Sequence, residues 1–187
     1  MGGMMYDPLY KSDMISQDAK RRIEEIKAGT HSPLGAYTIN SKGWNHVRQS
    51  VAKYIHERDG VETDPERIYL TNGASEGVKL AFTALIRSTN DGVLVPIPQY
   101  PLYSALLSLF GSELIPYYLD ENENWRMDAH NIEDQILRSI EDGVCPRAIV
   151  VINPGNPTGQ VMKKQDLQAI IKLCYKYSIL IMADEVY

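Results

Sequence analysis

The apolar positions along the chain follow two different periods, and their alternation predicts a sheet flanked by helices. Short runs of consecutive apolar residues predict buried strands, because a strand of a parallel sheet is covered on both faces. Between these runs, apolar residues recur every three or four positions, which predicts amphipathic helices. The expected strands are residues 67–71, 92–97, 113–118, 147–152 and 179–183. The expected helices are residues 17–27, 44–58, 74–87, 100–110, 128–140 and 163–177.

The order of these elements predicts the fold class. Strands and helices alternate after residue 60, which is typical of an α/β fold with an open, mainly parallel sheet and helices on both faces. Pro116 interrupts one strand and cannot donate to a ladder, so that strand is expected at the periphery. Asp128 is the expected N-cap of the helix that follows it. Residues 1–60 are expected to form an amino-terminal segment of helices and a loop at a subunit interface, and residues 61–187 a cofactor-binding domain.

Composition and charge narrow the classes of partner. Apolar residues make up 44% of the chain and charged residues 23%, as in ordinary globular proteins. The net charge of -5 and the lack of a basic stripe argue against nucleic acid as a partner. No stretch approaches the roughly 18 apolar residues of a membrane span, and the amino end does not resemble a secretory signal. We therefore expect neither a nucleic-acid nor a membrane partner.

The cysteines and histidines indicate a reducing compartment and no metal site. Cys145 and Cys174 have neither metal-ligand nor redox spacing, so they are expected to be reduced thiols in a cytoplasmic protein. The four histidines are scattered, with no second ligand three or four positions away.

Polar or glycine- and proline-rich segments follow four of the expected strands. In open α/β sheets, ligands bind beyond the carboxyl ends of the strands, so these segments are expected to meet at one edge. They are residues 71–75, 96–100, 153–159 and 184–187. Their convergence predicts a binding site.

The first of these segments, Thr71-Asn-Gly-Ala-Ser75, has the features of an anion cradle. Gly73 allows close approach of a ligand, and the N–H groups of Ala74 and Ser75 are expected at a helix N-terminus. An ordinary serine-containing N-cap explains the same residues. The glycine patterns of P-loops and dinucleotide-binding folds are absent from the sequence.

Asp184 closes a run of apolar residues, and a carboxylate is costly to desolvate there without a cation. The protonated ring nitrogen of a cofactor would be such a cation. A turn cap or a pair with an arginine would account for Asp184 equally.

Three further side chains could reach the same ligand. Tyr100 could lay its ring over a planar group or be a core tyrosine. Asn156 could offer its amide from a rigid loop or form an Asx turn. Tyr187 follows Asp184 by three positions, so it could contact the same ligand if the chain turns helical there.

Taken together and in this order, these segments resemble the cofactor half of fold-type-I pyridoxal-phosphate aminotransferases of class I and II, and alanine aminotransferases in particular. The resemblance spans residues 34–187. The matching segments are Leu34–Thr38, Thr71–Glu76, Val95–Ser104, Val151–Gln160 and Ala183–Tyr187.

The resemblance implies pyridoxal 5'-phosphate as the cofactor and a homodimer as the assembly. Ala74 and Ser75 would hold the cofactor phosphate. Tyr37 of the partner subunit would reach that phosphate across the dimer interface.

The resemblance also assigns the ring contacts of the cofactor. Tyr100 would stack on the pyridine ring, and Asp184 would pair with its protonated nitrogen. Asn156 and Tyr187 would hydrogen-bond its phenolic oxygen. Such a cofactor is an electron sink, which the charge of Asp184 deepens.

The resemblance stops short of the catalytic lysine. In the family, the lysine that binds the cofactor covalently lies beyond the residue that matches Tyr187, as do the substrate-binding arginine and the small domain. No residue of this chain is therefore assigned a catalytic role. The chain is expected to be a truncated cofactor domain, roughly half of a family member, and inactive alone. The whole enzyme would move an amino group between an amino acid, expected to be alanine, and a 2-oxo acid such as 2-oxoglutarate.

Two other functions stay open at this point. The missing lysine favours a non-catalytic fragment that binds the cofactor or pairs with a full-length subunit. A nucleotide-binding module of the Rossmann type would share the fold class, although its glycine fingerprint is absent.

Overall fold

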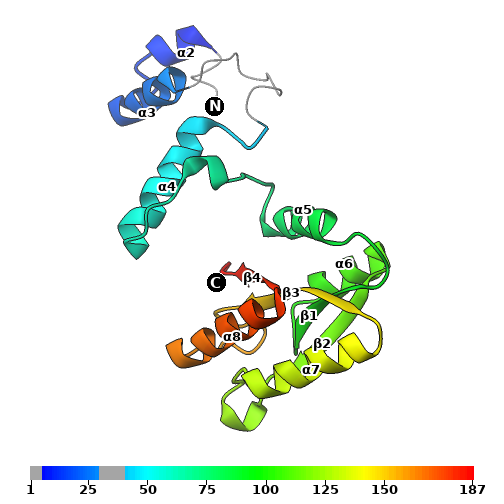
Figure 1. Ribbon diagram of the computed structural model, residues 1–187. Helices are drawn as coiled ribbons and strands as arrows, with labels where there is room; N and C mark the ends of the chain where they lie inside the picture. Colours follow the sequence, from blue (N-terminus) through cyan, green and yellow to red (C-terminus); the bar gives the residue numbers. More distant parts are fainter. Residues whose placement is uncertain (1–5, 30–40) are drawn as a thin grey trace. The chain divides into compact units, whose positions relative to one another are not determined.

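The computed structural model describes residues 6–29 and 41–187, which fall into two compact units. The first unit ends at Thr71 and the second runs from Asn72 to Tyr187. Residues 61–71 thus group with the amino-terminal helices, whereas the sequence pattern placed the boundary after residue 60. Figure 1 labels the elements of both units, which are described separately below.

In the first unit, a buried arginine joins a short 3-10 helix to one of the α-helices. Its helices are α2 (Asp7–Lys11), α3 (Gln17–Ala28), α4 (Asn45–Asp59) and the short 3-10 helix η1 (Pro65–Arg67). Arg48 of α4 is 6% exposed, and its Nη1 atom donates to the carbonyl of Pro65 at 2.7 Å and to Oε1 of Glu66 at 3.0 Å. These bonds fix η1 against α4. The expected helices at 17–27 and 44–58 are confirmed, and α2 is an additional one.

The expected strand at residues 67–71 is wrong. The 3-10 helix η1 takes up Arg67, and the backbone that follows is extended without forming a ladder. The N–H of Leu70 donates to the carbonyl of Lys42 at 2.9 Å, so this segment makes a backbone hydrogen bond to a loop rather than to a strand. The apolar run fits a strand, but within the described part of the first unit no strand lies beside it.

The second unit contains a sheet of four parallel strands in the order β2-β1-β3-β4. The strands are β1 (Asp91–Ile97), β2 (Glu113–Tyr118), β3 (Cys145–Ile152) and β4 (Leu180–Asp184). This confirms the predicted α/β class with a parallel sheet. The strand that contains Pro116 is β2, and it lies at the edge of the sheet as expected.

Four helices cover this sheet: α5 (Ala74–Leu85), α6 (Leu102–Phe110), α7 (Ala129–Glu141) and α8 (Lys164–Tyr177). Side chains of β1 alternate between its faces, so Val93 and Val95 pack with α5 and α6, while Leu94 packs with α7 and α8. The burial of both faces explains why the strands read as unbroken apolar runs.

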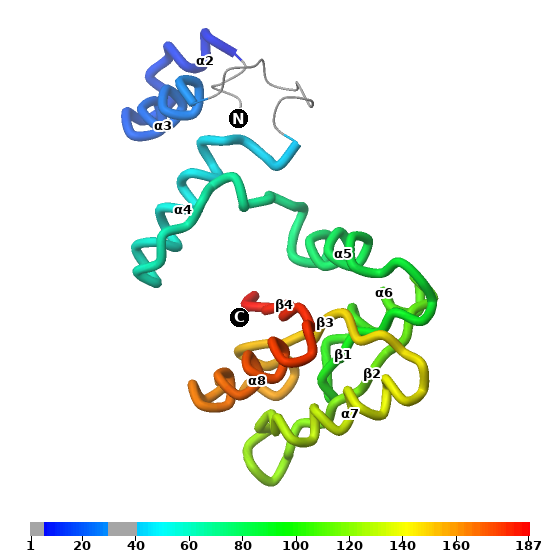
Figure 2. The backbone as a smooth tube through the Cα atoms, in the orientation of Figure 1, coloured from blue at the N-terminus to red at the C-terminus, as the bar shows by residue number. Residues whose placement is uncertain are grey.

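The connections bring the carboxyl ends of the strands to one edge. Each helix carries the chain back along the sheet before the next parallel strand begins, a path that the tube in Figure 2 follows. Asp128 caps α7 as expected, because its carboxylate accepts from the N–H of His130. Within the described ranges, no helix is both long and apolar enough to cross a membrane.

Candidate functional site

A pocket of about 240 Å³ lies in the second unit where α5, the segment after β1 and the ends of β3 and β4 meet. Five of the seven candidate residues line it. The lining is Ala74, Ser75, Val78, Tyr100, Leu102, Ile152, Asp184, Val186 and Tyr187. Asn156 adjoins the pocket through a hydrogen bond to Tyr187, and Tyr37 lies outside the described residues.

A larger cavity, of about 410 Å³, lies between the 3-10 helix η2 (Glu121–Glu123) and the start of α8. None of the candidate residues lines it. The charged groups there are largely paired with each other, since Arg126 bridges Glu123 and Asp166. The smaller pocket is therefore the better candidate, because several groups of different chemistry converge in it.

The N-terminus of α5 forms one wall of this pocket. Gly73 precedes the helix with a φ of 82°, a backbone conformation that favours glycine. The carboxylate of Glu76 accepts from the N–H of Asn72 at 2.7 Å and ties this turn to the first turn of the helix. The N–H groups at the start of a helix have no acceptor within the helix and favour an anion. Ala74 and Ser75 occupy that position, so this wall suits a phosphate.

Asp184 ends β4, and its two carboxylate oxygens have different partners. Oδ2 accepts a hydrogen bond from the hydroxyl of Tyr103, and Oδ1 accepts from the N–H of Val186 at 3.3 Å. Asp184 thus caps the turn after β4, one of the two structural roles that the sequence left open. In the described part of the chain its side-chain partners are a hydroxyl and a backbone N–H rather than an arginine.

Tyr103 is a site residue that sequence reasoning missed. It lies on α6, is 1% exposed and packs its ring against Phe82 with 6.4 Å between the centroids. Burial, and then the hydrogen bond to Asp184, raise the pKa of Tyr103 well above its usual value, so it remains a protonated donor. One feature of the sequence could have indicated its role. Tyr103 lies on the apolar face of its helix, and a buried tyrosine hydroxyl needs a hydrogen-bond partner.

The three remaining candidates surround the same space. Tyr100 is 43% exposed, so it is not a core tyrosine, and it lines the pocket. The side-chain amide of Asn156 donates to the hydroxyl of Tyr187, which brings the loop after β3 and the end of the chain together.

The pocket can hold a planar ligand that carries an anionic group and a protonated nitrogen. A helix N-terminus attracts the first, and a carboxylate attracts the second. Tyr100 supplies an aromatic face. Among the described residues, no group of three or more His, Cys, Asp or Glu side chains could hold a metal ion.

Comparison with known proteins gives a family for this arrangement. The model of the aminotransferase class I and II family matches residues 6–187. Glutamate–glyoxylate aminotransferase 1 of Arabidopsis thaliana is 47% identical over 93% of the chain, which covers 36% of that protein. Alanine aminotransferase 1 of Rattus norvegicus is 43% identical over 98% of the chain, which covers 38% of that protein.

Solved structures that resemble this chain are also aminotransferases. Alanine aminotransferase from Pyrococcus furiosus superposes with a TM-score of 0.73 and 30% identity, over 88% of this chain and 41% of that one. The chain spans about a third of the length of the curated relatives that it matches, rather than the half that the sequence suggested. Its parallel sheet and helices form part of a fold-type-I aminotransferase domain. Because the family model matches residues 6–187, this chain belongs to the aminotransferases of class I and II.

Proposed function

We propose that this chain is the cofactor-binding part of a pyridoxal-phosphate-dependent aminotransferase. The whole protein would move an amino group between an amino acid, alanine by the resemblance, and a 2-oxo acid such as 2-oxoglutarate. One observation carries the proposal: a single pocket is lined by the N-terminus of α5, by Tyr100 and by Asp184.

The chemistry of these groups fits pyridoxal 5'-phosphate. The N–H groups of Ala74 and Ser75, with the Ser75 hydroxyl, suit a phosphate dianion. Tyr100 suits the face of a pyridine ring, and Asp184 suits a protonated ring nitrogen. The side-chain amide of Asn156 and the hydroxyl of Tyr187 suit a phenolic oxygen, because both can donate a hydrogen bond to it.

When bound, the cofactor supplies an electron sink for the bond that breaks in the substrate. The task of Asp184 would be to keep a proton on the ring nitrogen, because its negative charge favours the protonated form. The buried hydroxyl of Tyr103 would fix the direction of that carboxylate. Asn156 and Tyr187 would bind the phenolic oxygen and hold the ring in one orientation.

The assembly and the compartment are part of the same proposal. A homodimer would bring Tyr37 of the partner subunit to the phosphate, as the resemblance implies. The proposed location is the cytoplasm, and its support is the two free cysteines, of which Cys174 is buried and Cys145 exposed.

We further propose that residues 1–187 bind the cofactor without turning over substrate. The described residues that line the pocket include no lysine, so no amine lies where a covalent bond to the cofactor would form. Binding would then depend on phosphate, ring and nitrogen contacts alone, and it would be weak and reversible.

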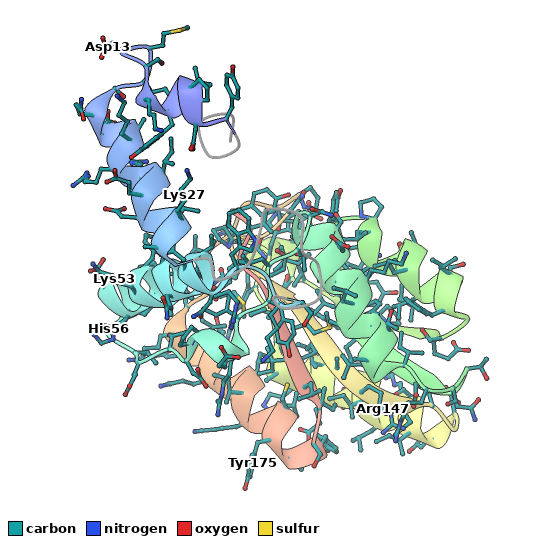
Figure 3. All side chains as sticks on the ribbon, turned by 90° about the horizontal axis from the view of Figure 1, so that it is seen from above. Asp13, Lys27, Lys53, His56, Arg147 and Tyr175 are labelled. Carbon is teal, nitrogen blue, oxygen red and sulfur yellow. The ribbon has the colours of Figure 1, made fainter. Side chains whose placement is uncertain are left out.

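The test is a spectroscopic titration of the purified chain with pyridoxal 5'-phosphate, compared with pyridoxal and with inorganic phosphate. We expect the phosphorylated compound to bind more tightly than pyridoxal. Replacing Tyr100 by Ala should weaken binding about 3- to 10-fold, the size of a lost aromatic contact. The matched control is Tyr175→Ala on α8, since Tyr175 is 89% exposed and points outward (Figure 3).

Three results would each contradict a part of this proposal. Equal binding of pyridoxal and pyridoxal 5'-phosphate would show that the N-terminus of α5 does not bind the phosphate. A stoichiometric lysine adduct trapped by borohydride, or turnover of alanine with 2-oxoglutarate above that of free cofactor, would show that this chain is itself catalytic.

A further inference from the structure

The loop between β3 and α8 is closed on itself by hydrogen bonds. The N–H of Met162 donates to Oδ1 of Asn153 at 3.0 Å, which joins the two ends of the loop. Inside this closure the N–H of Gly155 donates to the carbonyl of Gln160 at 2.9 Å. Asn156 lies within this doubly closed segment, so its backbone is held from both sides.

The interior of the loop is filled by a buried amide. Gln160 is 9% exposed, and its Oε1 accepts from the hydroxyl of Thr158. A Cβ atom on Gly155 would clash with the same oxygen, which leaves no space between this side chain and the backbone. The loop is therefore packed internally as well as closed at its ends.

Asn153 also ties the loop to the neighbouring strand. Its backbone N–H donates to the carbonyl of Asp184 at 3.0 Å and extends the β3–β4 pairing, in which Ile152 lies opposite Asp184. One residue thus bonds through its backbone to the residue that carries the pocket carboxylate, and through its side chain to the far end of the loop that carries Asn156.

We propose that Asn153 is a positioning residue, which sets the separation between Asp184 and the amide of Asn156. This inference rests on the proposed function, because those two groups would bind two different positions of the same ring, its nitrogen and its phenolic oxygen. Asn153 does not line the pocket, so it would act only through the loop. Without its side-chain acceptor, the ordering of the loop would depend on the inner bonds alone, and Asn156 would sample several positions.

The first measurement needs no ligand. ¹⁵N relaxation on the 187-residue chain reports order at the amides of Gly155, Asn156, Thr158 and Gly159. In Asn153→Ala we expect their order parameters to fall below about 0.6, while β3 and β4 stay near about 0.85. Asn153→Asp should keep the loop ordered, because a carboxylate oxygen accepts from the N–H of Met162 as the amide oxygen does. Asn131→Ala, on the exposed side of α7, is the matched control.

The second measurement uses pyridoxal 5'-phosphate as the probe. Asn153→Ala should weaken its binding about tenfold, and Asn153→Asp less than about threefold. In an Asn156→Ala background, Asn153→Ala should weaken binding less than about twofold, since the amide to be positioned is absent. A merely structural role for Asn153 would instead give the same loss in both backgrounds.

Each outcome decides the proposal. An ordered loop in Asn153→Ala, a loop as mobile in Asn153→Asp as in the alanine variant, or equal losses in both backgrounds would overturn it. If Asn153→Ala does not fold, Asn153→Ser, which keeps a shorter acceptor, should show an intermediate loss of order. If the unaltered chain binds no pyridoxal 5'-phosphate, the proposed function fails, whereas the relaxation data still decide whether Asn153 holds Asn156 in place.

Discussion

The hydroxyl of Tyr103 donates a hydrogen bond to the carboxylate of Asp184, a residue 81 positions later in the sequence. The tyrosine comes from α6 and the aspartate from the end of β4, so the bond joins a helix on one face of the sheet to a strand end at the pocket. Because Tyr103 is 1% exposed and belongs to the core, the direction of the Asp184 carboxylate is set by the core of the domain.

Removing the Tyr103 hydroxyl should destabilise the chain without disturbing its packing. In Tyr103→Phe the ring keeps its contact with Phe82, but Asp184 loses its buried donor. We expect the free energy of unfolding in urea to fall by about 1–2 kcal/mol, the range for a hydrogen bond to a partly exposed charged group. Tyr175→Phe, an exposed control, should change it by less than about 0.5 kcal/mol. An equal effect of both variants would show that the bond contributes nothing.

Changes at Asp184 should separate its structural role from its proposed cofactor role. Asp184→Asn keeps an oxygen that accepts from Tyr103, so we expect a loss of less than about 1 kcal/mol. Asp184→Leu leaves the Tyr103 hydroxyl without a partner and should cost about 1–3 kcal/mol. Both should weaken binding of pyridoxal 5'-phosphate, because neither carries a charge to match the ring nitrogen. Binding unchanged in Asp184→Asn would refute that role.

Acid stability should depend on Asp91. This carboxylate, 1% exposed, accepts from the backbone N–H of Arg87 at 2.7 Å and from Nε of Arg147 at 2.6 Å. These bonds, the backbone N–H first, lower the pKa of Asp91. Below about pH 4 the unfolded chain binds a proton that the folded chain does not, so stability falls as pH decreases through the folded-state pKa.

The measurement is a series of urea melts between pH 7 and pH 2.5. The unaltered chain should lose stability more steeply than Asp91→Asn below about pH 4, since the variant lacks this titration. At neutral pH, Asp91→Asn should be less stable by about 2–3 kcal/mol, because Arg147, labelled in Figure 3, loses its ionised partner. Parallel pH profiles would mean that other carboxylates dominate.

The packing of the loop after β3 predicts coupling between Gly155 and Gln160. Gly155→Ala places a methyl group against the end of the flexible Gln160 side chain, which must move aside, so we expect a loss of about 1 kcal/mol. Gln160→Ala creates the missing space, so the double variant should lose at least about 0.5 kcal/mol less than the sum of the single losses. Urea melts of the four proteins test this. Additive losses would show that the methyl group clashes elsewhere.

The two edges of the sheet should differ in their tendency to self-associate. At one edge, β2 contains Pro116, which removes a backbone donor. At the other edge of the described sheet, β4 exposes Leu180 and Ile181, at 57% and 40%. An unprotected apolar edge favours pairing with another chain, so we expect a dimer or larger species.

Light scattering over a hundredfold range of concentration measures this association. Ile181→Lys should shift the chain towards a monomer, because a charge on an edge strand opposes pairing. Tyr175→Lys, on the exposed face of α8, should leave the assembly unchanged. A monomer at every concentration for the unaltered chain would contradict the expectation.

The periodicity of apolar residues was enough to predict four strands and the main helices, because it reflects local spacing and the burial of both faces of a parallel sheet. The residue types of Pro116 and Asp128 predicted the peripheral strand and the helix cap. The convergence of Ala74, Tyr100 and Asp184 was also predictable, since the carboxyl ends of parallel strands share an edge. The sequence therefore determined the fold class and most of the residues that line the pocket.

Tertiary structure alone decided the features that depend on a partner distant in sequence. The apolar run at 67–71 has the composition of a strand, but a strand forms only where another strand offers a ladder. The hydroxyl of Tyr103 needs an acceptor, yet only the crossing of α6 over the sheet selects Asp184. In the same way, the sequence does not distinguish Asn153 from other polar loop residues. Only the pairing of β3 with β4 brings it next to Asp184. Spacing along the chain encodes burial, whereas a hydrogen bond between distant residues depends on how the elements pack.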